Sequence, residues 1–304
     1  MRERVLEEAI QIPQQHRPDP EPADPTPSPL LPEEPLVVIE PSRTWSGVGL
    51  QDLWRQRELL YFMIWRDLKV RYKQTVLGLL WVVMQPLLTT VVFTVFLGML
   101  ARVSSDGTPY PLFAFAGLLP WTFFANSVAN GSNSLVSNAH LLTKVYFPRL
   151  IIPVAAVGGR LVDFGVSFVL LVAMMIFYRV APGPGVLMLV PLILLLGLFS
   201  LGASLLASAL NVKYRDVGIA LPVLIQLWMF ISPVVYPTTL VPPAWRRLYS
   251  LNPVAGILEG FRSALFGREF DWLALASATV VTLALLVYAA FAFKRMEKTF
   301  ADLV

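Results

Sequence analysis

Cysteine is absent from this chain of 304 residues, histidine occurs only twice, and charged residues make up only 14% of the total. The lack of cysteine excludes disulfides, thiolate metal sites and cysteine nucleophiles. The two histidines, His16 and His140, are too isolated to form a cluster for acid–base chemistry. We therefore expect neither catalytic residues nor a metal site in this chain.

A phosphate-cradling loop is also missing. No segment matches GxxxxGK[ST], and no glycine is followed by lysine anywhere in the chain. Backbone amides and the lysine of that loop are what usually hold nucleotide phosphates. We therefore expect no cofactor in this chain, and any ATP and Mg²⁺ to be bound by a partner subunit.

Long apolar runs dominate what is present, since 56% of the residues are hydrophobic. A run of about 20 apolar residues is long enough to cross the hydrocarbon core of a bilayer. The sequence predicts an all-α integral membrane protein with six transmembrane helices, near residues 76–100, 111–128, 150–178, 186–210, 217–236 and 272–293. The far end of the second span is polar, because it carries Asn126, Asn130, Asn133 and Asn138.

Basic residues near the spans predict the orientation, because lysine and arginine in short loops tend to stay in the cytoplasm. Thirteen of them fall on one side: Arg55, Arg57, Arg66, Lys69, Arg71, Lys73, Lys144, Arg149, Lys213, Arg215, Lys294, Arg295 and Lys298. Both termini are therefore expected in the cytoplasm of a multi-pass inner-membrane protein, without a removable signal peptide. The fifth loop, which is also basic, is the exception.

The chain before the first span divides into two parts. Residues 1–45 hold nine of the twenty acids and ten of the twenty-five prolines, which is typical of a disordered cytoplasmic tail. Residues 46–75 place apolar side chains at steps of three and four, which predicts an amphipathic helix lying in the membrane interface. Residues 76–304 then form the six-span domain.

The interface helix also carries a basic stripe, formed by Arg66, Lys69 and Lys73, with Arg71 nearby. Such a stripe attracts anionic lipid head groups and phosphates. Two interpretations remain open: an anchor that only sets the orientation, or recognition of a phosphate-bearing substrate. Pro86 in the following span removes a helical hydrogen bond, and the resulting bend could open a lateral gap.

Two further regions of the apolar part of the chain contain charged or polar residues. Residues 237–271 are too interrupted to span twice and too apolar for a hydrated loop, so we expect a re-entrant helical hairpin against a translocation path. Arg160 and Asp163 lie three residues apart within the third span. They are expected to form an ion pair with each other, or else to line a polar path.

Six stretches carry a resemblance to a known family. They are LLYFMIWRDLKVRYKQTVLGLLWVVMQPLLTTVVFTVFLG (59–98), FAGLLPWTFF (115–124), LLTKVYFPRLIIP (141–153), NVKYRDV (211–217), ISPVVYP (231–237) and LNPVAGILEGFRSALFG (251–267). In this order they resemble the membrane subunit of polysaccharide-exporting type-2 ABC transporters, which move O-antigen, capsule or teichoic acid chains. The resemblance covers nearly the whole chain after the proline-rich tail.

The resemblance implies a homodimer of six-span permease subunits with two copies of a cytoplasmic ABC ATPase, and no nucleic acid as a partner. It also implies, as cargo, a polysaccharide attached to polyprenyl pyrophosphate in the membrane lipid. The pyrophosphate head group is expected at Arg66, Lys69, Arg71 and Lys73. ATPase coupling is expected at His140, Lys144, Tyr146, Phe147 and Arg149, and a second contact at residues 211–217 remains open.

Two further groups of residues are expected along the translocation path. Sugar rings stack on aromatic side chains, so a polysaccharide channel is expected at Phe93, Phe96, Trp121, Phe124 and Tyr236. By resemblance, a periplasmic gate is expected at Arg246, Arg247, Asn252, Glu259 and Arg262, and the charged residues of this loop are expected to stay hydrated at the outer mouth.

Three functions compete on this evidence. Export of lipid-linked polysaccharide is the first, and a type-2 ABC exporter of a drug or other small lipophile is the alternative. The basic surface helix favours the first, because it suits a pyrophosphate head group. An integral-membrane enzyme acting on lipid-linked sugar is disfavoured, because no cluster of acids or histidines is present.

Overall fold

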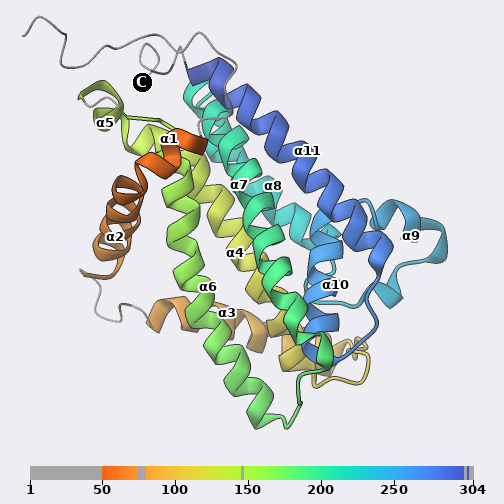
Figure 1. Ribbon diagram of the computed structural model, residues 1–304. Coiled ribbons are helices and arrows are strands. Elements are labelled where there is room, and N and C mark those ends of the chain that lie inside the picture. The colour runs from red at the N-terminus through yellow and green to blue at the C-terminus, as the bar shows by residue number, and fades with distance from the viewer. Residues whose placement is uncertain (1–49, 74–77, 79, 145–146, 298–299, 301–304) are drawn as a thin grey trace, which may run out of the picture. The chain divides into compact units, whose positions relative to one another are not determined.

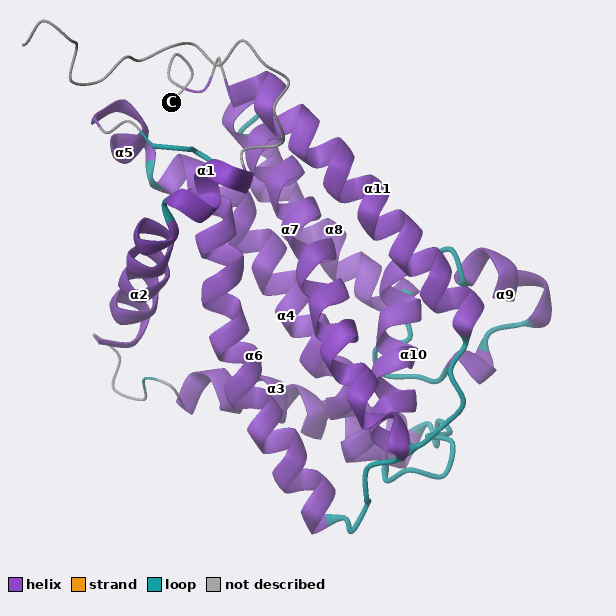
Figure 2. Cartoon of the chain, in the orientation of Figure 1, coloured by secondary structure: helices purple, strands orange, loops and turns teal. Residues whose placement is uncertain are grey.

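The computed structural model describes residues 50–73, 78, 80–144, 147–297 and 300. Figure 2 shows only helices and loops in this part of the chain, which confirms the predicted all-α class. The predicted tail at residues 1–45 lies outside the described residues, as do the ends of the predicted interface helix at 46–49 and 74–75.

In the part of the chain that the structure describes, five helical segments are long and apolar enough to cross a membrane. They are α3 (Leu80–Phe93) with the π-helix η1 (Thr94–Leu100), α4 (Tyr110–Ser137), α6 (Ile151–Phe177), the 3-10 turn η2 (Pro184–Met188) with α7 (Leu189–Lys213), and α11 (Trp272–Glu297). The predicted fifth span corresponds to α8 (Asp216–Ile231), which has only 16 residues. The count of six spans therefore stays a prediction.

Helix α4 is the centre of the packing. It contacts α3, α6, α7, α8 and α10, and most of its side chains are buried. A helix that is buried on all sides needs an apolar surface on all sides, and the stretch FAGLLPWTFF supplies it. Phe124 of this stretch stacks on Phe199 of α7 with ring centroids 5.2 Å apart, which joins the two helices.

The far end of α4 differs from the predicted edge at residue 128, because the helix continues through the asparagines to Ser137. The Asn130 side chain donates to the Asn126 carbonyl at 2.7 Å, and that of Asn138 to the Ser134 carbonyl at 2.8 Å. These bonds to the preceding turn satisfy the amides without breaking the helix. Asn211 of α7 also donates to the Ser132 carbonyl, so this end of α4 is held against α7.

The predicted basic side of the protein is gathered at one end of the helices. One buried cluster joins α2, α4, α6, α7 and α11 through Met63, Leu135, Ile151, Val212 and Phe293. Figure 1 shows α1, α5 and the end of α11 together at this end. The first, third and fifth loops meet at the opposite end, where Arg268 contacts Asp106 and Gly267 approaches Gly183. Which end faces the cytoplasm stays a prediction.

The predicted interface helix consists of two helices, α1 (Leu50–Arg55) and α2 (Arg57–Lys73). Helix α2 packs on α6, and Ile64 fits against Gly158 because that glycine has no side chain. The other face of the pair exposes large apolar side chains: Trp54, Tyr61, Phe62, Trp65 and Val70. An aromatic face of this kind suits the boundary between lipid and water.

Helix α3 crosses α6 obliquely in Figure 1. Pro86 lies in its middle, where it is buried, and it lacks the amide hydrogen that would bond the preceding turn. Thr89 and Thr90 donate their hydroxyls to the carbonyls of Gln85 and Pro86, at 2.9 and 2.8 Å. Such bonds to the preceding turn often bend a helix, and here they follow the proline directly.

The fifth loop folds into a 3-10 turn η3 (Thr238–Leu240) and two helices, α9 (Pro243–Tyr249) and α10 (Pro253–Phe266). Nearly every side chain of α10 is buried, against α4, α7 and α11. Gly267 ends α10 in the left-handed region at φ 67°, which favours glycine. The loop is thus a packed helical element, while its depth in a membrane stays a prediction.

Candidate functional site

A cavity of about 220 Å³ lies between the end of α2 and the helices α3, α4 and α6. Its lining residues include the charged Arg71, Arg160 and Asp163 as well as the apolar Trp81, Pro86 and Phe123. The middle of α3, with Pro86, therefore forms part of the wall. This cavity is the candidate substrate site, because it lies between the predicted basic helix and the span that contains Pro86.

Asp163 organises the polar side of this cavity. Its Oδ2 accepts hydrogen bonds from Arg71 Nη1 at 2.8 Å and from Arg160 Nη1 at 3.0 Å. The Tyr72 hydroxyl donates to Oδ1 of the same carboxylate. The predicted Arg160–Asp163 ion pair is therefore confirmed. The link to Arg71 and Tyr72 was not predicted, because these residues lie 92 and 91 positions away in the sequence.

The Tyr72 hydroxyl is the hydrogen-bond donor in its contact with Asp163. Burial raises the pKa of its hydroxyl above the usual value, and the hydrogen bond to Asp163 raises it further. The phenol therefore keeps its proton at neutral pH and donates it in a hydrogen bond to Oδ1, while the two guanidinium groups bond to Oδ2. The end of α2 is thus tied to α6 by an ion pair and a hydrogen bond to one residue.

The other predicted head-group residues lie outside the cavity. Arg66 pairs with Asp67 at 2.9 Å and donates to Asn138 Oδ1 at 2.9 Å, so it ties α2 to the end of α4. Lys69 and Lys73 are exposed. Of the four predicted residues only Arg71 lines the cavity, whereas the two lysines lie at the surface of α2.

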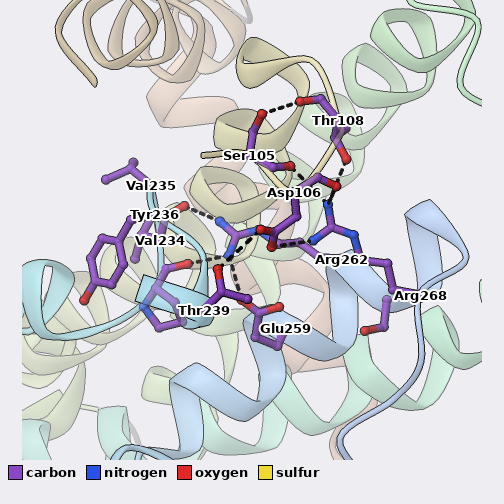
Figure 3. Close-up of polar contacts among 12 residues, drawn as sticks. Ser105, Asp106, Thr108, Val234, Val235, Tyr236, Thr239, Glu259, Arg262 and Arg268 are labelled. Atoms are coloured by element: carbon purple, nitrogen blue, oxygen red, sulfur yellow. Dashed lines mark hydrogen bonds and ion pairs between the residues drawn. The ribbon is translucent and has the colours of Figure 1, made fainter. Parts of the chain in front are cut away.

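The predicted gate at the other end is built around Arg262. Its side chain has no exposed surface, and its guanidinium group lies 3.9 Å from the ring centre of Phe113. Arg262 donates to the carbonyls of Pro233 and Val234, each at 2.6 Å, and to Glu259 Oε1 at 3.1 Å. Figure 3 shows these bonds between α10 and the turn that follows α8.

The expectation that Arg262 would stay hydrated at the outer mouth is wrong. The sequence shows its charge, but not the two carbonyls that the turn at residues 232–236 directs at it. These carbonyls and Glu259 replace water around the guanidinium, which lets a charge be buried. Position 117 of α4, beside this guanidinium, has room only for glycine. A Cβ there would overlap the Val234 carbonyl and the Arg262 guanidinium.

The other predicted gate residues lie in α9 and at the start of α10. Asn252 begins α10, where its Oδ1 accepts from the amide of Val254 at 3.1 Å, as expected of a helix N-cap. Arg246 is exposed and donates to the Val241 carbonyl. Arg247 lies in α9, and its side chain is outside the described part of the chain.

A second arginine, Arg268, was expected at the outer mouth but was not among the predicted gate residues. Arg268 donates to Asp106 Oδ2 at 3.2 Å, to the carbonyls of Ser105 and Asp106, and to the Thr108 hydroxyl. Figure 3 shows that it joins the loop between η1 and α4 to the end of α10. These contacts fix three neighbouring residues of a loop that lies about 160 positions earlier in the sequence.

The predicted coupling segment contains a short helix, α5 (Ala139–Lys144). His140 is exposed, whereas Phe147 packs into the buried cluster at this end. Arg149 donates to the backbone carbonyl of Glu297, so the segment is tied to the end of α11. Tyr146 lies outside the described residues, as does the side chain of Lys144.

The predicted channel aromatics fall into two groups. Trp121 and Phe124 are buried in the core, with only 4% and 1% of their surface exposed, so they offer a polymer almost no surface within the subunit. Phe96 is exposed, and Phe93 and Tyr236 are partly buried. A channel role for these three stays a prediction.

These features define a class of protein: a multi-pass helical membrane protein in which the short helix α2 is tied to the long helix α6, with a packed helical loop before the last long helix, α11. The chain belongs to the ABC-2 type transporter family, whose sequence model matches residues 58–266. The matched region extends from α2 through α10, and therefore contains both the cavity and the Arg262 assembly.

Similar proteins agree with this family. The O-antigen export system permease protein RfbA of Myxococcus xanthus is 29% identical over 256 residues, which cover 83% of this chain and 98% of the relative. A Klebsiella pneumoniae protein with the same name is 27% identical over 248 residues, 81% of this chain and 95% of the relative. The polysialic acid transport protein KpsM of Escherichia coli is 21% identical over 232 residues, which cover 73% of this chain and 89% of the relative.

Family membership confirms the resemblance predicted from the six sequence stretches. The chain is therefore a transport subunit of the membrane rather than an enzyme.

Proposed function

We propose that this protein is the permease subunit of an ATP-driven exporter in the inner membrane of a bacterium. Its cargo is a polysaccharide attached to polyprenyl pyrophosphate, with O-antigen as the first candidate, and it moves this cargo from the cytoplasm to the periplasm. The proposal is supported chiefly by relatives named for O-antigen export, which match this chain over nearly their full length.

The proposed assembly is a homodimer with two copies of a separate ABC ATPase. The ATPase docks on residues 140–150, where α5 lies at the same end as the start of α2 and the end of α11. Because Arg149 is bonded to the end of α11, a movement of this segment also pulls on the last span. Nucleotide-driven motion of the partner is thereby transmitted to the membrane helices.

The lipid-linked cargo is proposed to approach this end of the permease first. Lys69 and Lys73 are exposed on α2, beside the aromatic face that faces lipid in this proposal. Exposed lysines near a bilayer attract the charge of a pyrophosphate head group. Helix α3 then offers the lipid a lateral route past Pro86, and the polymer follows along the exposed aromatics toward the outer gate.

Replacing both Lys69 and Lys73 with glutamine is expected to lower surface polysaccharide about fivefold or more, because each lysine contributes on the order of 1 kcal/mol of attraction to anionic head groups. The measurement compares surface glycan in a strain that lacks the gene and carries either the variant or the wild-type copy. The matched control is a double replacement of Lys294 and Arg295, two exposed cations at the end of α11, with glutamine.

The same strains test the function itself. Without the gene, surface polysaccharide should be lost and glycan on polyprenyl pyrophosphate should accumulate inside the cell. Unchanged surface glycan in the deletion strain would refute polysaccharide export and favour a small lipophile as cargo. Normal export by the lysine variant alone, at equal protein abundance, would remove only the role of the two lysines.

A further inference from the structure

The charges around the cavity do not balance. Arg71 and Arg160 both bond to Asp163, and these three are the charged side chains among its described lining residues. Two guanidinium groups against one carboxylate leave one positive charge in excess. The exposed fractions of the three side chains are 28%, 15% and 14%, so water screens this charge poorly.

Arg160 also has a donor to spare. Its Nε is buried and bonds to none of the described residues, while its Nη1 is used by Asp163. A buried donor without a partner is costly, and buried polar groups normally have one. The donor, the excess charge and the cavity coincide at one place, which points to an anion as the missing partner.

The size and walls of the cavity narrow the choice of anion. Its volume of about 220 Å³ is below the range of about 300–1,000 Å³ that is usual for drug-sized ligands, so it fits a head group rather than a sugar chain. Trp81 and Pro86 of α3 also line the cavity, and neighbouring Leu80 is half exposed. A ligand with an anionic head and an apolar tail could therefore place its tail along α3.

We infer that this cavity binds the pyrophosphate of a prenyl pyrophosphate, with Arg160 and Arg71 as its ligands. The inference rests on the proposed function and adds a residue, Arg160, that the predicted head-group site did not contain. Asp163 holds both guanidinium groups in position and competes with the ligand for their hydrogen bonds. Lys69 and Lys73 lie outside the cavity and serve the earlier encounter at the surface.

The roles of Arg160 and Asp163 lead to opposite expectations for two variants. Arg160→Gln removes a charged donor and should weaken the binding of farnesyl pyrophosphate about ten- to a hundredfold, as is usual for a charge-assisted hydrogen bond. Asp163→Asn keeps the shape but removes the competing charge, and should tighten binding about tenfold. A purely structural ion pair would instead make both variants bind equally or more weakly.

The experiment measures binding to the purified permease–ATPase complex in nanodiscs by isothermal titration calorimetry. Farnesyl pyrophosphate is compared with farnesol and with inorganic pyrophosphate, which separates a lipid head group from a free phosphate. We expect farnesyl pyrophosphate to bind most tightly, and higher salt to weaken it. Arg102→Gln, which removes an exposed arginine beyond the end of η1, should leave binding unchanged.

Thermal unfolding of the same samples covers the case in which a variant folds poorly. Farnesyl pyrophosphate should raise the melting temperature more for Asp163→Asn than for the wild type, because tighter ligands stabilise more. Equal affinities in wild type, Arg160→Gln and Asp163→Asn would overturn the inference, as would inorganic pyrophosphate binding as tightly as the prenyl form. Either result leaves polysaccharide export intact, since the deletion strain tests it separately.

Discussion

Replacing Arg262 with methionine is expected to lower the melting temperature of the purified complex by on the order of 10 °C. Methionine fills much of the same space but cannot donate to the Pro233 and Val234 carbonyls, which Arg262 bonds at 2.6 Å. Removing one member of a buried charged assembly costs about 3–5 kcal/mol, since its partners are left unsatisfied. For a chain of this size that cost corresponds to a shift of roughly this magnitude.

The measurement is a thermal unfolding curve in detergent, followed by tryptophan fluorescence. Arg246→Met is the control, because Arg246 is exposed and makes a single described bond, to the Val241 carbonyl. Arg262→Lys should fall between the two, since an ammonium group lacks the planar fork that reaches both carbonyls. Equal melting temperatures for the Arg262 and Arg246 variants would contradict a structural role for Arg262.

Replacing Asp163 with alanine is expected to cost about 3 kcal/mol of stability, because it leaves Arg71 and Arg160 facing each other with no carboxylate between them. It also removes the acceptor of the Tyr72 hydroxyl, so α2 loses two side-chain bonds to α6. The amount of folded protein should fall, and surface polysaccharide should fall with it. A displaced α2 would also move Lys69 and Lys73, the exposed lysines of the proposed head-group encounter.

Asp67→Ala is the matched control for this variant. Asp67 also pairs with an arginine of α2, Arg66, at 2.9 Å, but the two side chains are 41% and 32% exposed. Exposed pairs of this kind contribute at most about 1 kcal/mol. The melting temperature of Asp163→Ala should therefore be clearly lower than that of Asp67→Ala. An equal decrease in melting temperature for the two variants would argue against a stabilising role for the contacts of Asp163 with α2.

The helical class and most of the long apolar helices could be predicted, because a membrane imposes a length and an apolar composition that are visible in the sequence. The polar end of α4 was harder to place. Asn130 and Asn138 resemble a helix end when only their polarity is considered, but they bond the carbonyls of the preceding turn. A hydropathy pattern does not show such side-chain hydrogen bonds to the backbone, so it could not predict that the helix continues.

The candidate site shows the same division between local and distant contacts. The Arg160–Asp163 pair follows from a spacing of three residues on one helix, and the structure confirms it. The bond from Arg71 to Asp163 joins residues 92 positions apart, so only the packing of α2 on α6 creates it. Likewise, Arg262 was expected in water because nothing in the sequence indicates that two backbone carbonyls converge on it.

The most direct test of the proposed function is translocation in proteoliposomes that contain the purified permease with or without its ABC ATPase. The cargo is polyprenyl-pyrophosphate-linked glycan on the outer leaflet, and its entry into the lumen is read as protection from an added glycosidase. We expect protection only when permease, ATPase and ATP are all present, because this chain has no P-loop of its own. Equal protection by the permease alone, without nucleotide, would contradict the account.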